Sequence, residues 1–237
     1  MSAPVLADRR FSENRPPDLR RTPPWHRLAY IVRRLPAELE ALAGELEVGP
    51  AGRVLDFGCA DLAYRRFFPA GVEYVGADLA GNPMAMLEIA SDGTLTAPDA
   101  SFDAVLSTQV LEHAEDPEVH LAECARVLRP GGRLLLSTHG LMIWHPDPVD
   151  LWRWTSQGLP LVVERAGLDV IRFEGIMGLT ATGVQMTQDG LLARLPRRLH
   201  GALALVFQTL AALADRLDGR ESRRMNALVF ALVASKP

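Results

Sequence analysis

The sequence predicts an α/β fold with a doubly wound, mostly parallel sheet. Short apolar runs, ending in or followed by Gly, Asp or Ser, alternate with segments of helical periodicity. A Pro-Gly-Gly turn at 130–132 separates one such helix from the next apolar run. Strands that alternate with helices favour parallel pairing in a sheet covered on both faces. The predicted strands are residues 53–57, 73–77, 104–107 and 133–137, and the clearest helix is 117–128.

Helical patterns also precede and follow this core. In residues 25–46, Leu, Ile and Val recur at steps of three and four, which predicts one or two N-terminal helices interrupted near Pro36. Beyond Gly140 we expect a helix over about 155–167, a strand over 168–173, a helical stretch over 188–218 and a final buried strand over 227–234. The long helical stretch is therefore an insert before the last strand.

A length of 237 residues suits one α/β domain with an elaboration. We divide the chain into a loose N-terminal arm (1–24), the domain itself (25–184 and 225–237) and the helical insert (185–224). The arm carries five prolines among Arg, Asp and Ser, so it buries too little apolar surface to order by itself.

The composition narrows the classes of function. Lys and Arg number 25 against 29 Asp and Glu, so no sequence-wide positive field favours a nucleic-acid partner. No stretch of about 18 apolar residues predicts a membrane span, and no apolar core suggests a signal peptide, so we expect a cytoplasmic protein. Cys59 and Cys124 lack partners at metal-ligand spacing, and we expect neither a disulfide nor a metal site.

The segment from Val54 to Asp61 (VLDFGCAD) leads a buried strand into a turn of Gly and other small residues. Where side chains are small or absent, a ligand can approach the backbone closely, and a helix that follows would present unpaired N–H groups to the ligand. Asp78 ends the next predicted strand, and a carboxylate there suits a pair of ribose hydroxyls. The simpler alternative is that Gly58 only permits a tight turn and Asp78 is a surface carboxylate.

Further features follow in order along the chain: SFDAV at 101–105, LEH at 111–113 and RVLRPGG at 126–132. Together with the Gly turn and Asp78, they resemble the class I S-adenosylmethionine-dependent methyltransferases of the type 11 group. The resemblance covers about residues 54–173 and the closing strand. It implies a Rossmann-like fold, S-adenosylmethionine as the cofactor and methyl transfer as the activity.

The same resemblance implies a set of cofactor contacts. They are Asp56, Gly58 and Cys59 at the methionine end, Asp78 at the ribose, Leu79 and Asp92 at the adenine, and Gln109 on the inner side of the cofactor. For Asp92 the alternative is a turn former before Gly93. We expect the thiol of Cys59 to be a small buried group without chemistry of its own.

One departure concerns the turn itself. The glycine usual between Cys59 and Asp61 in such families is Ala60 here, and a later glycine is Leu62. We expect Ala60 to be tolerated if its φ stays negative, although its methyl narrows the room beside the methionine moiety. Either cofactor binding is weakened or the loop is shifted, which leaves a non-catalytic binding or scaffolding subunit as an alternative function.

The acceptor is expected at the same edge, since ligands lie outside the carboxyl ends of parallel strands. The segment 138–155 follows a predicted strand and contains two His, three Trp and one Arg. Flat apolar faces with fixed polar groups suit a polar small molecule, so we predict that Trp144, Trp152, Arg153 and Trp154 bind it. The alternative is that the tryptophans anchor the next helix and Arg153 pairs with Asp150.

Three histidines are candidate bases. His139 follows directly on a predicted strand, so its imidazole is expected at the carboxyl edge of the sheet. Its ordinary pKa near 6.5 leaves a neutral fraction that can accept a proton from a hydroxyl group. His145 and His113 are the further candidates. For His139 the alternative is a hydrogen bond to a nearby backbone carbonyl, and for His113 the alternative is that it holds its loop by hydrogen bonds.

The helical insert is apolar almost all round, with Arg194, Arg197 and Arg198 at one end. A helix with so broad an apolar face must bury it. Packing within the subunit is the first interpretation. A homo-oligomer contact or a substrate lid comes second, and contact with a membrane surface comes third.

The sequence therefore predicts an S-adenosylmethionine-dependent methyltransferase acting on a small-molecule acceptor, a saccharide or a secondary metabolite, by O- or N-methylation. An NAD-dependent oxidoreductase is disfavoured because the DFGC turn lacks the G-x-G-x-x-G spacing of dinucleotide-binding proteins.

Overall fold

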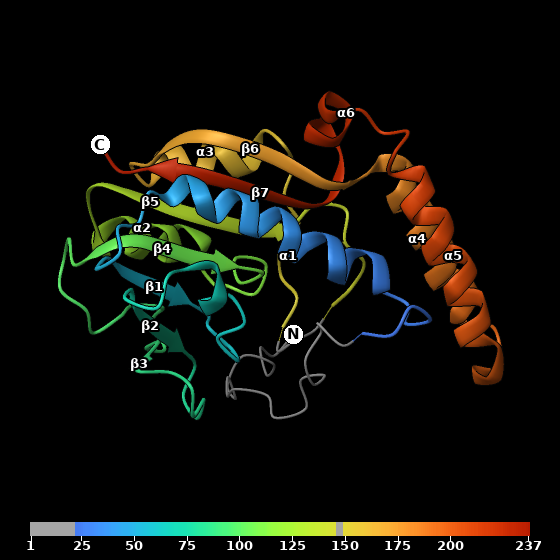
Figure 1. The fold of residues 1–237 in the computed structure, drawn as a ribbon, viewed down its shortest axis with the longest axis horizontal. Helices are drawn as coiled ribbons and strands as arrows, with labels where there is room; N and C mark the ends of the chain where they lie inside the picture. Colours follow the sequence, from blue (N-terminus) through green and yellow to red (C-terminus); the bar gives the residue numbers. More distant parts are fainter. Residues whose placement is uncertain (1–21, 146–148) are drawn as a thin grey trace, which may run out of the picture.

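The computed structural model describes residues 22–145 and 149–237, and its centre is a seven-stranded sheet of order β3-β2-β1-β4-β5-β7-β6 (Figure 1). The strands are β1 (Arg53–Phe57), β2 (Glu73–Asp78), β3 (Leu87–Glu88), β4 (Phe102–Thr108), β5 (Leu128–His139), β6 (Asp169–Gly178) and β7 (Ala227–Ser235). Strands β1 to β5 pair in parallel, and β7 runs antiparallel between β5 and β6. The predicted Rossmann-like α/β fold is confirmed.

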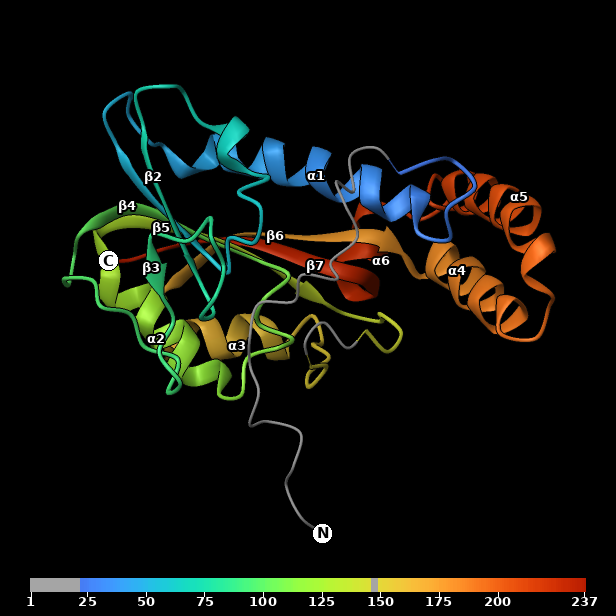
Figure 2. The same cartoon turned by 90° about the horizontal axis from the view of Figure 1, so that it is seen from below.

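Helices cover both faces of this sheet. They are α1 (Ala29–Ala43), α2 (Pro117–Val127), α3 (Gly158–Arg165), α4 (Leu179–Leu192), α5 (His200–Ala214) and α6 (Arg220–Met225), with short 3-10 helices η2 (Gly44–Leu46), η3 (Arg65–Phe67) and η4 (Arg197–Leu199). Figure 2 shows α1 on one face and α2 with α3 on the other. Helices α4 and α5 form a hairpin that projects beyond the sheet in both views. Among the described residues, no helix has the length and apolar character needed to cross a bilayer.

Strand β7 links the two hydrophobic cores. All residues from Ala227 to Ala234 are buried, and from Val229 onward they alternate between the core under α1 and the core under α2 and α3. A strand covered on both faces gains from apolar side chains at every position, which explains the unbroken run ALVFALVA. The sequence patterns of the interior strands are set by this double burial.

The predicted interruption near Pro36 is wrong, because α1 continues through this residue as a single helix. An interior proline removes one N–H donor and crowds the preceding turn, at a cost of roughly 3 kcal/mol. Ile31, Leu39 and Leu42 of the same helix are buried against the sheet. Burying each such side chain contributes about 1.5–3 kcal/mol, which together outweighs the cost of the proline.

A second difference lies on the β2 side of the sheet. A helix was expected directly after β1, but residues 58–72, all of them described, form turns and the 3-10 helix η3 instead. Residues 79–101 likewise contain turns, the two-residue strand β3 and an isolated bridge between Ile89 and Leu95. The Gly turn is therefore shaped by loop contacts and not by the N-terminus of an α-helix.

The insert before the last strand is helical, as predicted, but it contains two main helices. Helix α4 begins at Leu179 directly after β6, and the hairpin turn contains Pro196, which cannot donate a helical hydrogen bond. Three buried glutamine side chains, Gln185, Gln188 and Gln208, each donate a hydrogen bond to the carbonyl of Arg27, at 3.0, 2.8 and 2.8 Å. These bonds join the hairpin to the start of α1.

Candidate active site

The first part of the site lies at the carboxyl end of β2. One oxygen of Asp78, Oδ2, accepts from the main-chain N–H of Ala60 at 2.8 Å and from Nδ2 of Asn82 at 2.7 Å. The other, Oδ1, accepts from the N–H of Leu79 at 2.8 Å. Sγ of Cys59 also lies 4.0 Å from Oδ2, whereas Oδ1 accepts a single hydrogen bond and keeps a second lone pair. Asp78 therefore fits a ribose hydroxyl while also fixing the turn after β1.

The turn after β1 has an unusual backbone. Gly58, Ala60 and Leu62 have φ of +87°, +47° and +56°. The condition stated for tolerating Ala60, a negative φ, is therefore not met. For residues other than glycine this left-handed conformation costs about 1–2 kcal/mol, so the turn carries strain at two positions where related families use glycine. The hydrogen bond from the Ala60 N–H to the buried Asp78 carboxylate helps to offset that strain.

Two further predicted cofactor residues line the same turn. Asp56 is buried on β1 and accepts a hydrogen bond from the hydroxyl of Tyr74 at 2.7 Å. Burial, followed by the charge of Asp56, raises the pKa of that hydroxyl well above its usual range. Cys59 packs on β2, where a Cβ added at Gly76 would fall 2.7 Å from its Sγ. The thiol thus fills a space that only glycine leaves open on the neighbouring strand.

The remaining predicted cofactor residues lie on either side. Gln109 follows β4 with a φ of +58°, and its Nε2 donates to Oγ of Ser137 at 3.2 Å. Asp92 is exposed, and its Oδ1 accepts from the N–H and the hydroxyl of Thr94 at 3.0 and 2.7 Å. These bonds lower the pKa of Asp92 and have the geometry of the turn-forming alternative. Contact of either residue with the cofactor remains a prediction.

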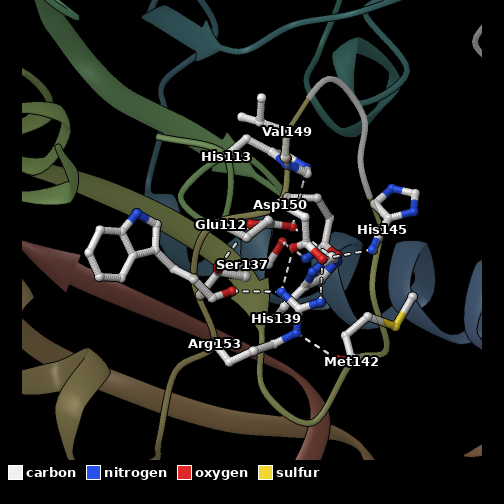
Figure 3. Close-up of polar contacts among 12 residues, drawn as sticks. Glu112, His113, Ser137, His139, Met142, His145, Val149, Asp150 and Arg153 are labelled. Carbon is white, nitrogen blue, oxygen red and sulfur yellow. Dashed lines mark hydrogen bonds and ion pairs between the residues drawn. The ribbon is translucent and has the colours of Figure 1, made fainter. Parts of the chain in front are cut away.

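The second part of the site is centred on Glu112, just beyond the carboxyl end of β4 (Figure 3). This side chain is completely buried. Its Oε1 lies 3.1 Å from Nε2 of His139, the last residue of β5, and its Oε2 accepts from the hydroxyl of Thr138 at 2.8 Å. Its main-chain carbonyl accepts from the N–H groups of Leu151 and Trp152 at 3.0 and 3.2 Å. Glu112 therefore connects β5 to the segment that precedes α3.

The three predicted histidines meet at this carboxylate. Their ring centroids lie 6.1 Å apart for His113 and His139, 5.9 Å for His113 and His145, and 5.6 Å for His139 and His145. Nδ1 of His113 is hydrogen-bonded to the carbonyl of Val149, a contact of the kind expected if His113 holds its loop. Nδ1 of His139 is buried and has no hydrogen-bond partner among the described residues. His139 is thus the candidate with a ring nitrogen left for an acceptor.

Burial controls the charge of the central pair. Desolvation raises the pKa of Glu112 from its ordinary 4.5 to about 8. Desolvation, followed by the positive charge of Arg153, lowers the pKa of His139 from 6.5 to about 3. Both side chains are therefore neutral near pH 7, which removes the cost of burying an isolated charge. The described residues contain no cluster of His, Cys, Asp or Glu arranged to hold a metal ion.

The predicted acceptor-binding residues differ in their surroundings. Arg153 makes a bidentate ion pair with Asp150, at 2.5 and 2.7 Å, and also donates to the carbonyls of Met142 and Ile143. The pairing alternative thus accounts for its guanidinium. Nε1 of Trp152 donates to a backbone carbonyl, while Trp154 packs against the core. Trp144 is 75% exposed and Trp152 is 40% exposed, so both ring faces remain accessible. Acceptor contact remains a prediction for this whole segment.

Glu112 is the central residue that sequence reasoning did not single out. It stands between Leu111 and His113 directly after a buried strand, in the same LEH segment that drew attention to the histidine. A carboxylate at the carboxyl end of a parallel strand, flanked by apolar residues, was the available signal. Its pairing with His139, 27 positions later, depends on the parallel alignment of β4 and β5.

Comparison with known proteins agrees with this geometry. Residues 55–136 match the family model described as a methyltransferase domain. The chain is 31% identical over 182 residues to a ubiquinone biosynthesis O-methyltransferase of Dinoroseobacter shibae, covering 64% of this chain and 73% of that protein. It is 32% identical over 185 residues to a protein of Mycolicibacterium smegmatis named a probable S-adenosylmethionine-dependent methyltransferase, covering 70% and 66%.

Solved structures show the same fold. The cyclase SpnF superposes with a TM-score of 0.52 at 21% identity, covering 84% of this chain and 80% of that one. Phosphoethanolamine N-methyltransferase 2 of Haemonchus contortus, in complex with S-adenosyl-L-methionine, gives a TM-score of 0.53 at 17% identity, covering 85% of this chain and 52% of that one. At such identities the likeness concerns the fold alone.

The sheet order, the acidic end of β2 and the polar site at the carboxyl edge define a class I methyltransferase. With the sequence relatives above, the chain belongs to the type 11 group of S-adenosylmethionine-dependent methyltransferases. S-adenosylmethionine is its cofactor, and the comparisons favour an enzyme over the non-catalytic subunit considered from the sequence.

The strained turn gives a first prediction. Replacing Ala60 by glycine relieves a left-handed residue beside the cofactor segment, so we expect Ala60→Gly to stabilise the protein by about 1 kcal/mol and to tighten S-adenosylhomocysteine binding. Ala100 also has a positive φ, of 51°, but lies in an exposed turn between β3 and β4. Ala100→Gly should stabilise to a similar extent in urea unfolding without changing affinity measured by calorimetry. Equal affinity in wild type and Ala60→Gly would show that the strain does not reach the site.

The buried pair gives a second prediction, on pH. The folded pKa of Glu112, about 8, exceeds its ordinary 4.5, so its contribution to stability decreases as pH rises from 4.5 to 8. The depressed pKa of His139, about 3, makes stability increase as pH rises from 3 to 6.5. The two offset between pH 4.5 and 6.5, and only the Glu112 effect remains above pH 6.5.

We therefore expect the free energy of unfolding of the wild type to fall between pH 6.5 and 8 and that of Glu112→Gln to lack this fall. Urea unfolding at several pH values measures the free energy of unfolding of both proteins. Glu123→Gln is the matched control, because hydrogen bonds from Arg126 lower the pKa of Glu123 instead of raising it. A decline of the same slope in Glu112→Gln and the wild type would assign the pH dependence to other groups.

Proposed function

We propose that this methyltransferase acts on a hydroxyl or amino group of a small-molecule acceptor, a saccharide or a secondary metabolite, bound beside His139. The observation that carries the proposal is the buried Nδ1 of His139, which has no hydrogen-bond partner among the described residues while Nε2 faces Glu112. A ring nitrogen held in place from its other side is the arrangement of an oriented general base. The relatives named ubiquinone biosynthesis O-methyltransferases support a small acceptor and transfer to oxygen.

The placement of the two parts of the site supports the same proposal. Asp78 ends β2 and His139 ends β5, so both lie at the carboxyl edge of one sheet, where parallel α/β proteins bind their ligands. When bound, S-adenosylmethionine supplies a sulfonium methyl group that is already activated for in-line transfer. The protein then has three tasks: to align the acceptor, to exclude water and to remove a proton.

The side chains at this edge divide those tasks. His139 receives the acceptor proton at Nδ1 as the acceptor atom bonds to the methyl carbon. The ring is neutral near pH 7, so Nδ1 has a lone pair for that proton when Nε2 carries the ring hydrogen. Glu112 is a positioning residue, because its buried Oε1 lies 3.1 Å from Nε2 on the far side of the ring. The exposed faces of Trp144 and Trp152 offer flat apolar surfaces against which an acceptor ring can stack.

The cofactor part of the proposal is tested by Asp78→Ala. Loss of a charge-assisted acceptor is expected to weaken S-adenosylhomocysteine binding, measured by calorimetry, by about 1–3 kcal/mol. The matched variant Asn82→Ala removes the bonds of this side chain to the Asp78 carboxylate, the Ala60 carbonyl and the Met84 N–H, but keeps the carboxylate itself. It should change affinity much less. Equal losses in the two variants would mean that Asp78 acts only by ordering the loop.

The catalytic part is tested with labelled S-adenosylmethionine and a panel of phenols, hydroxylated benzoates, sugars and amines. We expect methylation of one acceptor class, and we expect His139→Gln to lower that rate by roughly 10²–10⁴-fold with cofactor affinity unchanged. His200→Gln is the control, since His200 lies in the hairpin and its Nε2 is hydrogen-bonded to the carbonyl of Leu195. A His139→Gln enzyme within about threefold of wild type would remove His139 from the role of base.

A further inference from the structure

The hairpin of α4 and α5 presents an apolar surface that no other described element covers. Its outer residues on and just beyond α5 are 46–80% exposed, and they recur at steps of three and four along one side of the helix. They are Val206, Leu210, Leu213 and Leu217. We call this set the outer face. The opposite side of α5 is made of buried Ala204, Gln208 and Ala211, which pack inward.

The charges around the outer face have one sign. Residues 179–217 contain Arg194, Arg197, Arg198 and Arg216, all exposed, and two aspartates. Both aspartates face inward, where Asp189 pairs with Arg27 and Asp215 accepts from Tyr30 and the N–H of Gly178. Among the described residues, none of the four arginines has an ion pair. The surface of the hairpin is therefore positive in a chain of net charge −4.

These arginines flank the outer face. Arg197 and Arg198 form η4 immediately before α5, and Arg216 follows its last turn. A helix of 15 residues is about 22 Å long, too short to cross the roughly 30 Å hydrocarbon core of a bilayer. A short apolar helix face flanked by arginines is the pattern of a helix that lies in the plane of a membrane surface. The snorkelling arginine side chains then reach the lipid headgroups.

The contacts at the base of the hairpin determine the edge of the sheet from which it projects. The three glutamine bonds to the Arg27 carbonyl hold it against α1. Helix α4 leaves the sheet at Gly178, the end of β6, and β6 runs parallel to β5 because both are antiparallel to β7. Val229 of β7 is opposite His139 on one side and Ile176 on the other. The hairpin therefore departs from the same carboxyl edge that holds the candidate base.

We propose that the hairpin docks this enzyme on the surface of a membrane that contains anionic lipid, with the outer face inserted among the headgroups and the arginines bound to phosphate. The enzyme lies on the bilayer and does not span it. Charge complementarity selects this occupant over a second copy of the chain, since a two-fold contact through the outer face would bring two sets of unpaired arginines together.

Sedimentation with lipid vesicles tests the proposal on the full-length chain. Vesicles of phosphatidylcholine with an equal share of phosphatidylglycerol should pellet the protein, while pure phosphatidylcholine should pellet much less. Binding should weaken with added salt, because attraction to anionic lipid is screened. Equal binding to both kinds of vesicle, or to neither, would overturn the proposal.

Two variants identify the surface. Arg197→Glu with Arg198→Glu should reduce binding to the anionic vesicles by about tenfold or more, and Leu210→Asp with Leu213→Asp should do the same. The matched controls lie on α3 and are exposed to a similar extent: Arg165→Glu for charge and Leu161→Asp, at 48% exposure, for the apolar group. Both controls should bind as the wild type does. Equal losses in the controls would overturn the assignment to the hairpin.

Light scattering without lipid tests the alternative occupant of the outer face, a second copy of the chain. A monomer that binds anionic vesicles supports the proposal. A dimer that the Leu210→Asp with Leu213→Asp variant converts to monomer would instead show that the outer face is a subunit interface. S-adenosylhomocysteine affinity should stay unchanged in every hairpin variant, so this test does not depend on the identity of the acceptor.

Discussion

The central constraint on this molecule is the position of β7, the last strand of the chain, between β5 and β6. Hydrogen bonding on both edges and burial on both faces leave it no tolerance for polar side chains from Ala227 to Ala234. Its register against β5 sets Val229 opposite His139, and its register against β6 sets Ala227 opposite Gly178. The position of the candidate base and the point at which the hairpin leaves the sheet thus both follow from the pairing of one strand.

The two parts of the site solve the problem of buried polar groups differently. At β2 the Asp78 carboxylate accepts from the main-chain N–H of Ala60 in the strained turn and from that of Leu79 after the strand. A side chain thus satisfies backbone donors that a helix N-terminus would otherwise leave exposed at this turn. At β5 the low polarity of the interior keeps Glu112 and His139 neutral, as their shifted pKa values indicate. In both places a carboxyl group, ionised in Asp78 and neutral in Glu112, takes the place of solvent beside polar groups that the fold removes from water.

The sequence predicted best where burial alone decides the structure. Strand β1 begins and ends at the predicted residues because its apolar run stops at Gly58. Strand β6 extends to Gly178, beyond the predicted residue 173, because its pairing with β7 continues through Glu174. The carboxylate of Glu174 forms ion pairs with Arg172 and Arg220. The local sequence pattern of residues 169–178 contains no information about this pairing with a distant strand. The continuous α1 was missed for a related reason, since sheet packing outweighs its interior proline.

Of the candidate site, the sequence could identify the histidines and Asp78 because each follows a predicted strand. It could not identify the distances between them. The pairing of Glu112 with His139 is set by the parallel alignment of β4 and β5, and the left-handed φ of Ala60 is set by the hydrogen bond to Asp78. Both are tertiary effects that override what the residue type prefers.

The position of the hairpin at the carboxyl edge bears on how an acceptor would reach the site. It leaves the sheet from the carboxyl edge, so a protein resting on a membrane by its outer face would hold that edge near the lipid and not on the far side of the domain. An acceptor with an apolar portion partitions into the bilayer, where its concentration exceeds that in water. Delivery along the surface would then spare the enzyme a deep apolar pocket of its own. The exposed tryptophans between β5 and α3 are suited to the same boundary, because their amphipathic rings are enriched where apolar and aqueous phases meet.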